Sequence, residues 1–280
     1  MAGLNPGQPL LAVSGQQWPG VVYGCTTRAG GVSTGPWGTL NLAMHVGDEP
    51  QAVLENRRRL ARGLPREPFW LDQVHGTAVV EVVDTGYIPL GVAQAGEGGA
   101  STLCTDATVP RADAAVTTQA GVVLAIMTAD CLPVVIADID GRALGVAHAG
   151  WRGLAAGVLE ATLGALRASL PDARGWRVWI GPAISQSCFE VGEDVRSAFV
   201  DTLPATAACF LAGKQPGKWY ADLAGLACHH LETMGVYAIE LSGLCTYTRR
   251  DLFHSYRRSA TTGRMVTVAW LQSEQAPDLP

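Results

Sequence analysis

Short apolar runs recur along the chain, and each is bounded by glycine, proline or aspartate. The runs are rich in β-branched and aromatic side chains, a composition that is typical of β-strands. The predicted strands are 21–23 with a continuation to 26–27, 78–83, 114–118, 122–127, 133–137, 143–148, 176–180, 236–240 and 265–271. We therefore expect more strands than helices.

Helical spacing of apolar residues appears in three segments. Residues 51–62 place Glu55 and Arg59 four positions apart, as charge pairs on a helix do. Residues 154–169 carry a stripe of leucine and valine, and a third helix follows Asp222 as its N-cap and stops at Gly235. Helices and strands mix without strict βαβ alternation, which predicts an α+β fold with mixed or antiparallel sheets.

One domain is expected over residues 1–280, because neither a repeat nor a clear shift in composition divides the chain. Residues 1–20 contain Pro6, Gly7 and Pro9 and are interpreted as a loosely ordered N-terminal extension. Residues 91–100 (GVAQAGEGGA) are of low complexity and predict a flexible surface loop.

Composition and charge narrow the function. The 280 residues are 48% hydrophobic and 16% charged, with a formal net charge of -5, which excludes intrinsic disorder. No cluster of lysine and arginine of the nucleic-acid type appears, so no nucleic-acid partner is expected. No targeting signal is recognised, and the most apolar run, 120–129, is too short to span a bilayer. We expect a cytoplasmic protein, without a membrane partner, whose seven cysteines are reduced.

The segment from 128 to 153 carries the candidate chemistry. Asp140-Gly141 between two apolar runs predicts a β-hairpin, in which residues whose numbers add to about 280 lie opposite each other. Cys131 and His148 add to 279, so they are expected on neighbouring strands at the same end. This placement suits either a thiolate–imidazole pair or two ligands of one metal ion.

A helix is expected to begin near Trp151, directly after His148 and the Ala149-Gly150 turn. The amides at its start would form an anion site, because the N-terminal end of a helix dipole is positive. Arg152 in the first turn is unfavourable there by about 0.3–1 kcal/mol unless it binds an anionic ligand. Elsewhere, His75 at a loop–strand junction, Arg28 before a Gly-Gly turn and His254 in an arginine-rich segment are weak candidates when taken singly.

Eight segments taken together resemble the YfiH-like family, also called laccase-domain or polyphenol-oxidase-type proteins. They are TTRAGGVSTGP (26–36), TLNLAMHVGDEP (39–50), LDQVHG (71–76), RADAAVT (111–117), TADCLPVV (128–135), GVAHAGWRG (145–153), IGPAISQSCFEVG (180–192) and SYRRSATTGRM (255–265). The resemblance covers most of residues 21–271 and implies a single-domain α-β-β-α sandwich with mixed sheets.

The resemblance also implies a function and its residues. It implies one metal ion, usually zinc, held by His75, Cys131 and His148, with a fourth coordination position open as in catalytic zinc sites. It implies a purine nucleoside phosphorylase with adenosine deaminase activity on adenosine, inosine and methylthioadenosine. Cys131, His148 and Arg152 are then the expected catalytic residues. Arg28, Asn41 and Arg152 are the expected substrate-binding residues, and the partners are purine nucleosides and phosphate.

Other functions stay open from the sequence. Two histidines and one cysteine also suit copper, as a copper-dependent polyphenol oxidase would require. Without a metal, Cys131 and His148 could serve as nucleophile and base of a hydrolase. A non-catalytic binding module is the least expected function. The state of association is expected to be a monomer or a small homo-oligomer, and His254 stands where the family commonly has an aromatic residue.

Overall fold

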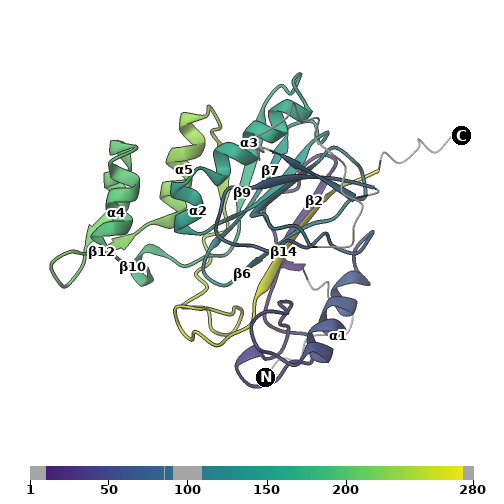
Figure 1. Cartoon of the computed structure of the whole chain (residues 1–280), viewed down its shortest axis with the longest axis horizontal. Helices are drawn as coiled ribbons and strands as arrows, with labels where there is room; N and C mark the ends of the chain where they lie inside the picture. The colour runs from purple at the N-terminus through teal and green to yellow at the C-terminus, as the bar shows by residue number, and fades with distance from the viewer. Residues whose placement is uncertain (1–10, 85, 91–108, 274–280) are drawn as a thin grey trace, which may run out of the picture.

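Two β-sheets packed face to face form the centre of the protein, and helices cover their outer faces (Figure 1). The computed structural model describes residues 11–84, 86–90 and 109–273. The four-stranded sheet has the order β1 (Leu11–Val13), β2 (Val21–Thr26), β14 (Met265–Leu271) and β6 (Leu124–Thr128). The seven-stranded sheet has the order β13 (Ala238–Leu241), β9 (Trp176–Ile180), β7 (Leu132–Asp138), β8 (Leu144–Ala149), β5 (Ala114–Thr117), β3 (Val79–Val83) and β4 (Gly86–Leu90).

The sheets are mixed, as the sequence predicts. Strand β13 runs parallel to β9, and β3 runs parallel to β5, whereas the other pairs of neighbouring strands are antiparallel. Helix α1 (Pro50–Ala61) lies on the four-stranded sheet, and α3 (Val158–Ser169) and α5 (Leu223–Thr233) lie on the seven-stranded sheet. This arrangement is the predicted α-β-β-α sandwich.

The core has three layers because the central strands are buried on both faces. In β6, Leu124 and Ile126 face the other sheet, whereas Val123 before the strand and Ala125 within it face α1. Strand β8 alternates in the same way, with Val146 between the sheets and Ala147 under α3. Burial on both faces explains why these strands are read as continuous apolar runs rather than as alternating ones.

A smaller lobe lies beside the seven-stranded sheet (Figure 1). It consists of α4 (Glu193–Val200) and a three-stranded sheet of β10 (Glu190–Gly192), β12 (Lys218–Ala221) and β11 (Phe210–Ala212). Short 3-10 helices lie at Gly35–Trp37, Gln186–Cys188 and Pro204–Cys209. The sequence did not predict this lobe, because strands of three or four residues are too short to show alternation.

Two predictions of local structure were wrong. The helix expected over 154–169 is interrupted, because Gly157 adopts a left-handed φ of 96° between α2 (Trp151–Ala155) and α3. In the predicted N-terminal extension, β1 pairs with β2 and Trp18 is buried, so residues 11–20 are not loosely ordered. Residues 1–10 and the predicted loop at 91–100 lie outside the described residues.

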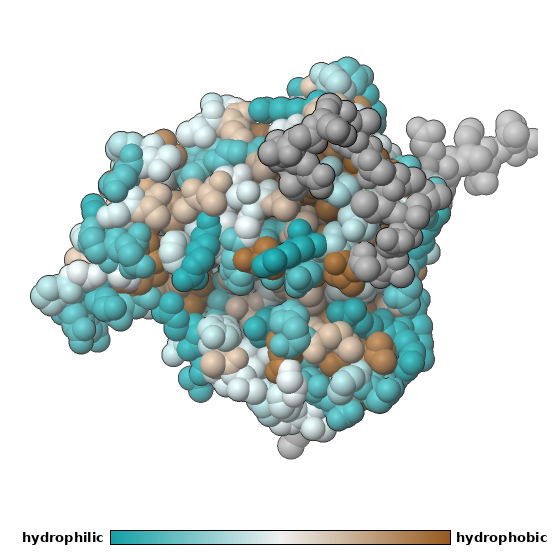
Figure 2. Space-filling model, viewed as in Figure 1, coloured by the Kyte–Doolittle hydropathy of each residue, from teal (hydrophilic) through white to brown (hydrophobic). Residues whose placement is uncertain are grey.

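The surface is more polar than the core. The face shown in Figure 2 is largely hydrophilic, with hydrophobic side chains in small separate groups, as on most proteins in water. Within the described ranges, no helix combines the length and the apolar character needed to cross a bilayer.

Candidate functional site

The β7–β8 hairpin brings Cys131 and His148 to one end of the seven-stranded sheet. Pro133 pairs with His148 and Leu132 with Ala149, so Cys131 comes immediately before the first paired residue of β7. The predicted hairpin is confirmed. Paired residues add to 281, whereas Cys131 and His148 add to 279, so these two are not directly opposite each other. Cys131 and His148 therefore lie diagonally across the strand ends.

His75 reaches the same place from the loop that precedes β3. It has a left-handed φ of 62°, which costs a residue other than glycine about 1–3 kcal/mol. The buried carboxylate of Asp113 offsets this cost. It accepts the backbone N–H groups of Val74 (3.1 Å), His75 (2.9 Å) and Gly76 (2.6 Å) and so fixes the turn.

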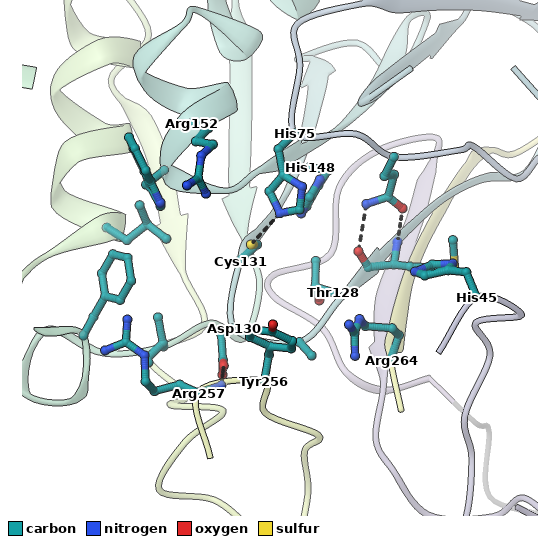
Figure 3. Close-up of a pocket in the computed structure, with 17 residues that line it drawn as sticks. His45, His75, Thr128, Asp130, Cys131, His148, Arg152, Tyr256, Arg257 and Arg264 are labelled. Atoms are coloured by element: carbon teal, nitrogen blue, oxygen red, sulfur yellow. Dashed lines mark hydrogen bonds between the residues drawn. The ribbon is translucent and has the colours of Figure 1, made fainter. Parts of the chain in front are cut away.

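The three side chains form a compact cluster, the His–Cys–His triad (His75, Cys131 and His148). One ligand atom from each lies within 4.8 Å of the others. Figure 3 shows both imidazoles directed at the thiol, and Cys131 Sγ lies 3.8 Å from His75 Nε2. The Nδ1 atom of His148 lies 2.8 Å from Asp113 Oδ1, which leaves Nε2 free to face the cluster.

Gly150 allows this close approach. A Cβ atom at this position would lie 2.8 Å from His75 Cδ2 and 2.9 Å from Cys131 Sγ, distances at which atoms overlap. Its φ of -70° is open to every residue, so the requirement for glycine comes from space and not from backbone conformation. The cluster is thus closed by main chain on this side.

The cluster favours separated charges when no metal is bound. Burial alone would raise the pKa of Cys131, but the imidazoles of His148 and His75 outweigh it and lower the pKa to about 6. Burial alone would lower the pKa of His148, but the Cys131 thiolate and the Asp113 carboxylate raise it to about 9. Burial opposes ionisation of Asp113 too, yet hydrogen bonds from His148 and the backbone lower its pKa. A thiolate beside an imidazolium is the favoured state.

This donor set fits a metal ion. Imidazole nitrogen and thiolate sulfur are the ligands that zinc prefers, and three protein ligands leave one position for substrate or water. Within the residues that the structure describes, the triad is the one group of three such donors close enough to share an ion. The triad could therefore hold a metal ion.

A cavity of about 590 Å³ opens onto the triad (Figure 3). Its side chains fall into an apolar group, a polar group and three arginines. The lining residues are His45, Gln73, His75, Met127, Thr128, Ala129, Asp130, Cys131, His148, Trp151, Arg152, Ile184, Phe189, Leu223, Tyr256, Arg257 and Arg264. The size suits a ligand of the dimensions of a nucleoside or a drug.

Three arginines, Arg152, Arg257 and Arg264, give the cavity a positive charge. None of them forms an ion pair with a carboxylate among the described residues. Arg152 lies 4.4 Å from the ring centre of Trp151, and Arg257 donates to the carbonyl of Glu190 (2.9 Å). Guanidinium groups without a carboxylate partner can bind an anion that enters the cavity.

Arg152 lies where the sequence places it, but the helix-dipole reasoning behind it does not hold. Helix α2 has five residues, so Arg152 belongs to its last turn as much as to its first. The dipole of so short a helix gives neither an anion site nor a penalty for this cation. What supports an anion-binding role for Arg152 is its place in the cavity.

The cavity includes neither Arg28 nor Asn41, the other two residues predicted to bind substrate. Arg28 donates instead to the carbonyls of Gly38 (2.9 Å) and Arg250 (3.3 Å). Asn41 is fully buried, and its Oδ1 accepts the backbone N–H of Arg264 (3.0 Å). The structure thus places Asn41 behind the cavity, where it fixes the main chain of an arginine that lines it.

His254, which the sequence left unassigned, is a core residue. It is fully buried outside the cavity, and burial together with the nearby Arg28 guanidinium lowers its pKa to about 3. A Cβ on Gly263 would lie 2.6 Å from its Nε2, so main chain packs directly on the ring. The imidazole is therefore neutral and fills space.

Sequence reasoning missed Asp130, which joins the triad to the arginines. Its carboxylate accepts hydrogen bonds from Thr246 Oγ1 (2.6 Å), Ser255 Oγ (3.0 Å) and the backbone N–H of Arg257 (2.6 Å). These bonds hold the segment that carries Arg257 against the residue preceding Cys131. Asp113, Arg257 and Arg264 were also unassigned, although they stand in the segments RADAAVT and SYRRSATTGRM.

Two bacterial proteins with assigned names are similar to this chain over most of its length. A purine nucleoside phosphorylase of Pseudomonas aeruginosa is 44% identical over 255 residues, which cover 91% of this chain and 95% of that protein. The purine nucleoside phosphorylase YfiH of Escherichia coli is 43% identical over 260 residues, 91% of this chain and 97% of that protein.

Solved structures show the same fold. The Neisseria meningitidis protein NMB0706 superimposes with a TM-score of 0.77 at 40% identity and covers 92% of this chain and 98% of its own. YlmD from Geobacillus stearothermophilus gives a TM-score of 0.78 at 33% identity, with 95% of both chains covered. A family model described as multi-copper polyphenol oxidoreductase laccase matches residues 22–272. This chain therefore belongs to the laccase-domain family that includes the YfiH proteins.

Proposed function

We propose that this chain is a zinc-dependent purine nucleoside phosphorylase that also deaminates adenosine. It would convert adenosine, inosine or methylthioadenosine and phosphate into a free base and the corresponding sugar 1-phosphate. The observation that carries the proposal is one cavity in which the His–Cys–His triad and three arginines meet. The names of the relatives, which are purine nucleoside phosphorylases, support it.

Phosphate binding falls to the arginines. Guanidinium groups bind phosphate oxygens through paired, charge-assisted hydrogen bonds. Arg152, Arg257 and Arg264 would hold the phosphate while one of its oxygens bonds to C1′ of the ribose. The bond from C1′ to the purine nitrogen breaks in the same step, and its electrons leave with the base. Holding the nucleophile in place lowers the barrier because its freedom is lost on binding and not in the reaction.

The nucleoside would occupy the apolar part of the cavity. Trp151, Ile184, Phe189 and Leu223 form an apolar wall, and Tyr256 projects with 56% of its surface exposed. Flat aromatic and branched side chains suit the faces of a purine ring. The triad lines the same cavity, and Asp113 behind it holds the His148 ring in place. A zinc ion on the triad would supply a Lewis acid that activates water for deamination.

A metal-free thiol hydrolase is the second candidate, and one observation favours it. Cys131, His148 and Asp113 have the order of a thiol–imidazole–carboxylate triad, with a thiolate favoured at a pKa of about 6. His75 has no part in such a mechanism, yet the Asp113 hydrogen bonds hold it against the thiol. Turnover of a nucleoside that stops when metal is removed excludes this candidate.

A copper-dependent polyphenol oxidase is the third candidate, since the same three donors suit copper. Multicopper chemistry needs further histidines close together, and the remaining four in this chain are dispersed. His229 and His230 lie on α5, His254 lies in the core, and His45 lies at the cavity without a second imidazole beside it. Among the residues that the structure describes, at most one copper ion would find three His or Cys ligands.

The test measures products by mass spectrometry after incubation of the zinc-loaded protein with nucleoside and phosphate. Arg152→Ala should raise the KM for phosphate by about 10–100-fold, because a hydrogen bond to a charged group contributes about 1.5–3 kcal/mol. Deamination should suffer less, since it needs no phosphate. Arg62→Ala, an exposed arginine outside the cavity, is the control.

Equal losses of both activities in a folded Arg152→Ala variant would show that Arg152 does not bind phosphate. Absence of any free base with every nucleoside tried would overturn the proposed function itself.

A further inference from the structure

One buried carboxylate contacts two of the three residues of the triad. Asp113 Oδ1 accepts from the Nδ1 of His148 (2.8 Å) and from the backbone N–H of His75 (2.9 Å). Asp113 Oδ2 accepts from the backbone N–H groups of Val74 (3.1 Å) and Gly76 (2.6 Å). The Asp113 side chain thus accepts four hydrogen bonds and has no exposed surface.

We propose that Asp113 is a positioning residue that sets up the triad for a metal ion, before any ion is bound. It does so in two ways at once, holding His148 by its ring and His75 by its main chain. This inference rests on the metal site proposed above and concerns a residue that does not itself reach the ion or the substrate.

The bond to the His148 ring fixes which nitrogen binds the metal. A neutral imidazole carries one proton, and a carboxylate at Nδ1 keeps that proton on Nδ1. When a metal ion binds and His148 gives up one proton, the remaining proton stays on Nδ1, so Nε2 offers its lone pair to the ion. A carboxylate in this position also makes the imidazole a stronger ligand, and replacing such a partner typically weakens metal binding about 10–100-fold.

The bonds to the loop fix the position of the His75 ring. The left-handed φ of His75 is unfavourable without compensation, and the N–H groups of residues 74–76 all converge on Asp113. Loss of that acceptor frees the loop to relax to an ordinary conformation. The His75 imidazole would then leave its position 3.8 Å from the thiol.

Asparagine in place of Asp113 cannot make the same four bonds. An amide has one oxygen, so its NH₂ must face either the His148 ring or the N–H groups of Val74 and Gly76. Facing the ring, it makes Nδ1 an acceptor and puts the proton on Nε2, the nitrogen that must bind the metal. Facing the N–H groups, it opposes donor to donor and opens the loop.

A control lies at the turn of the β7–β8 hairpin, the end away from the triad. Asp138 is also a buried carboxylate, and it accepts the backbone N–H groups of Asp140, Arg142 and Ala143. Among the described residues, Asp138 has no histidine partner. Asp138→Asn therefore disturbs backbone hydrogen bonds of the same kind, and the ion pair of Asp138 with Arg142 (3.6 Å), without touching the triad.

The experiment measures zinc affinity by competition with a chromophoric chelator for the wild type, Asp113→Asn and Asp138→Asn. Circular dichroism establishes the folded fraction of each. Asp113→Asn should bind zinc about 10–100-fold more weakly than the wild type, and Asp138→Asn should stay within threefold of it. With cobalt as probe, the thiolate-to-metal absorption band should shift in Asp113→Asn and stay unchanged in Asp138→Asn.

Asp113→Glu keeps the charge and both acceptor oxygens. It should recover part of the affinity that Asp113→Asn loses, and it replaces the asparagine variant in the comparison if the latter does not fold. A folded Asp113→Asn with wild-type affinity and spectrum would overturn the inference. Equal losses in Asp113→Asn and Asp138→Asn would do so too, because they would indicate general loosening of the hairpin. A wild type that binds no metal would refute the metal site on which the inference rests.

Discussion

A buried aspartate and a tightly packed glycine lie at each end of the β7–β8 hairpin, but only the end away from the turn borders the cavity that the triad lines. At the turn, Asp138 collects backbone N–H groups and Gly141 packs against Pro19 and Gly20. At the open end, Asp113 collects backbone N–H groups and Gly150 packs against the triad.

The difference between the two ends separates contacts that stabilise the fold from contacts that hold functional side chains. An aspartate that caps backbone donors, or a glycine in a close contact, is a structural device that carries no function by itself. At the open end the same devices hold two imidazoles and a thiol at the mouth of a cavity with three arginines. Substitutions at the turn should therefore change stability, and substitutions at the open end should change metal binding.

The largest effect is expected from Cys131→Ala. This variant removes one of the three metal-binding side chains. Losing only the hydrogen-bond partner of a ligand weakens metal binding by up to about 100-fold, so loss of the ligand itself should weaken zinc binding further. The fold should persist, because the thiol ends a strand and is partly exposed. Chelator competition and circular dichroism measure the two quantities. Undiminished zinc affinity in this variant would remove Cys131 from the site.

Gly150→Ala and Gly141→Ala should separate function from stability. The added Cβ at 150 collides with His75 and Cys131, so zinc binding should weaken at least about tenfold, a lower bound taken from ligand repositioning. At 141 the φ is 72° and the Cβ would overlap the carbonyl of Pro19. The left-handed conformation alone costs about 1–2 kcal/mol of unfolding free energy, while zinc affinity of the folded chain should stay unchanged.

Denaturant unfolding and zinc titration of both glycine variants give the result. The comparison between the two ends fails if Gly141→Ala weakens zinc binding more than Gly150→Ala does.

The smallest effects are expected for two threonines at strand ends, where the same substitution should change the free energy of unfolding in opposite directions. Thr128 and Thr117 each end a strand and are almost fully buried. Thr117 Oγ1 donates to the carbonyl of Val82 (2.8 Å). Thr128 lines the cavity, and its Oγ1 has no hydrogen-bond partner in the described part of the chain. Thr117→Val should lose about 1 kcal/mol of unfolding free energy, because a made hydrogen bond is removed.

Thr128→Val should keep or gain stability, since an unpartnered buried hydroxyl costs about 1–3 kcal/mol. Urea unfolding of the two variants decides the matter. Equal destabilisation by Thr117→Val and Thr128→Val would show that the Thr128 hydroxyl has a hydrogen-bond partner in solution. Thr128 would then stabilise the fold in the same way as Thr117.

Much of this architecture could be predicted from local pattern. The hairpin followed from Asp140-Gly141 between two apolar runs, and its pairing placed Cys131 near His148. The break at Gly157 was missed because the leucine stripe continues across it, and helical spacing does not reveal a left-handed residue. The lobe of α4 and the three-stranded sheet was missed because its strands are too short for alternation to show.

The spacing of residues in the sequence predicted only part of the site. His75 lies 56 residues before Cys131 and on another element, so its place in the triad came from the resemblance and not from pairing. Arg257 and Arg264 were not assigned because neither lies in the strands and helices that pattern predicts, and their positions depend on hydrogen bonds to Asp130 and Asn41. Distant side-chain contacts of this kind leave no periodic signal in a sequence.

The most direct test of the account is the metal content of the protein under native conditions. Native mass spectrometry after loading with zinc and removal of excess ion should give one zinc per wild-type chain. The same treatment of a His75→Ala, Cys131→Ala, His148→Ala triple variant should give none, with the fold retained by circular dichroism. No zinc in the wild type, or one zinc still bound to the folded triple variant, would contradict the assignment of the triad as a metal centre.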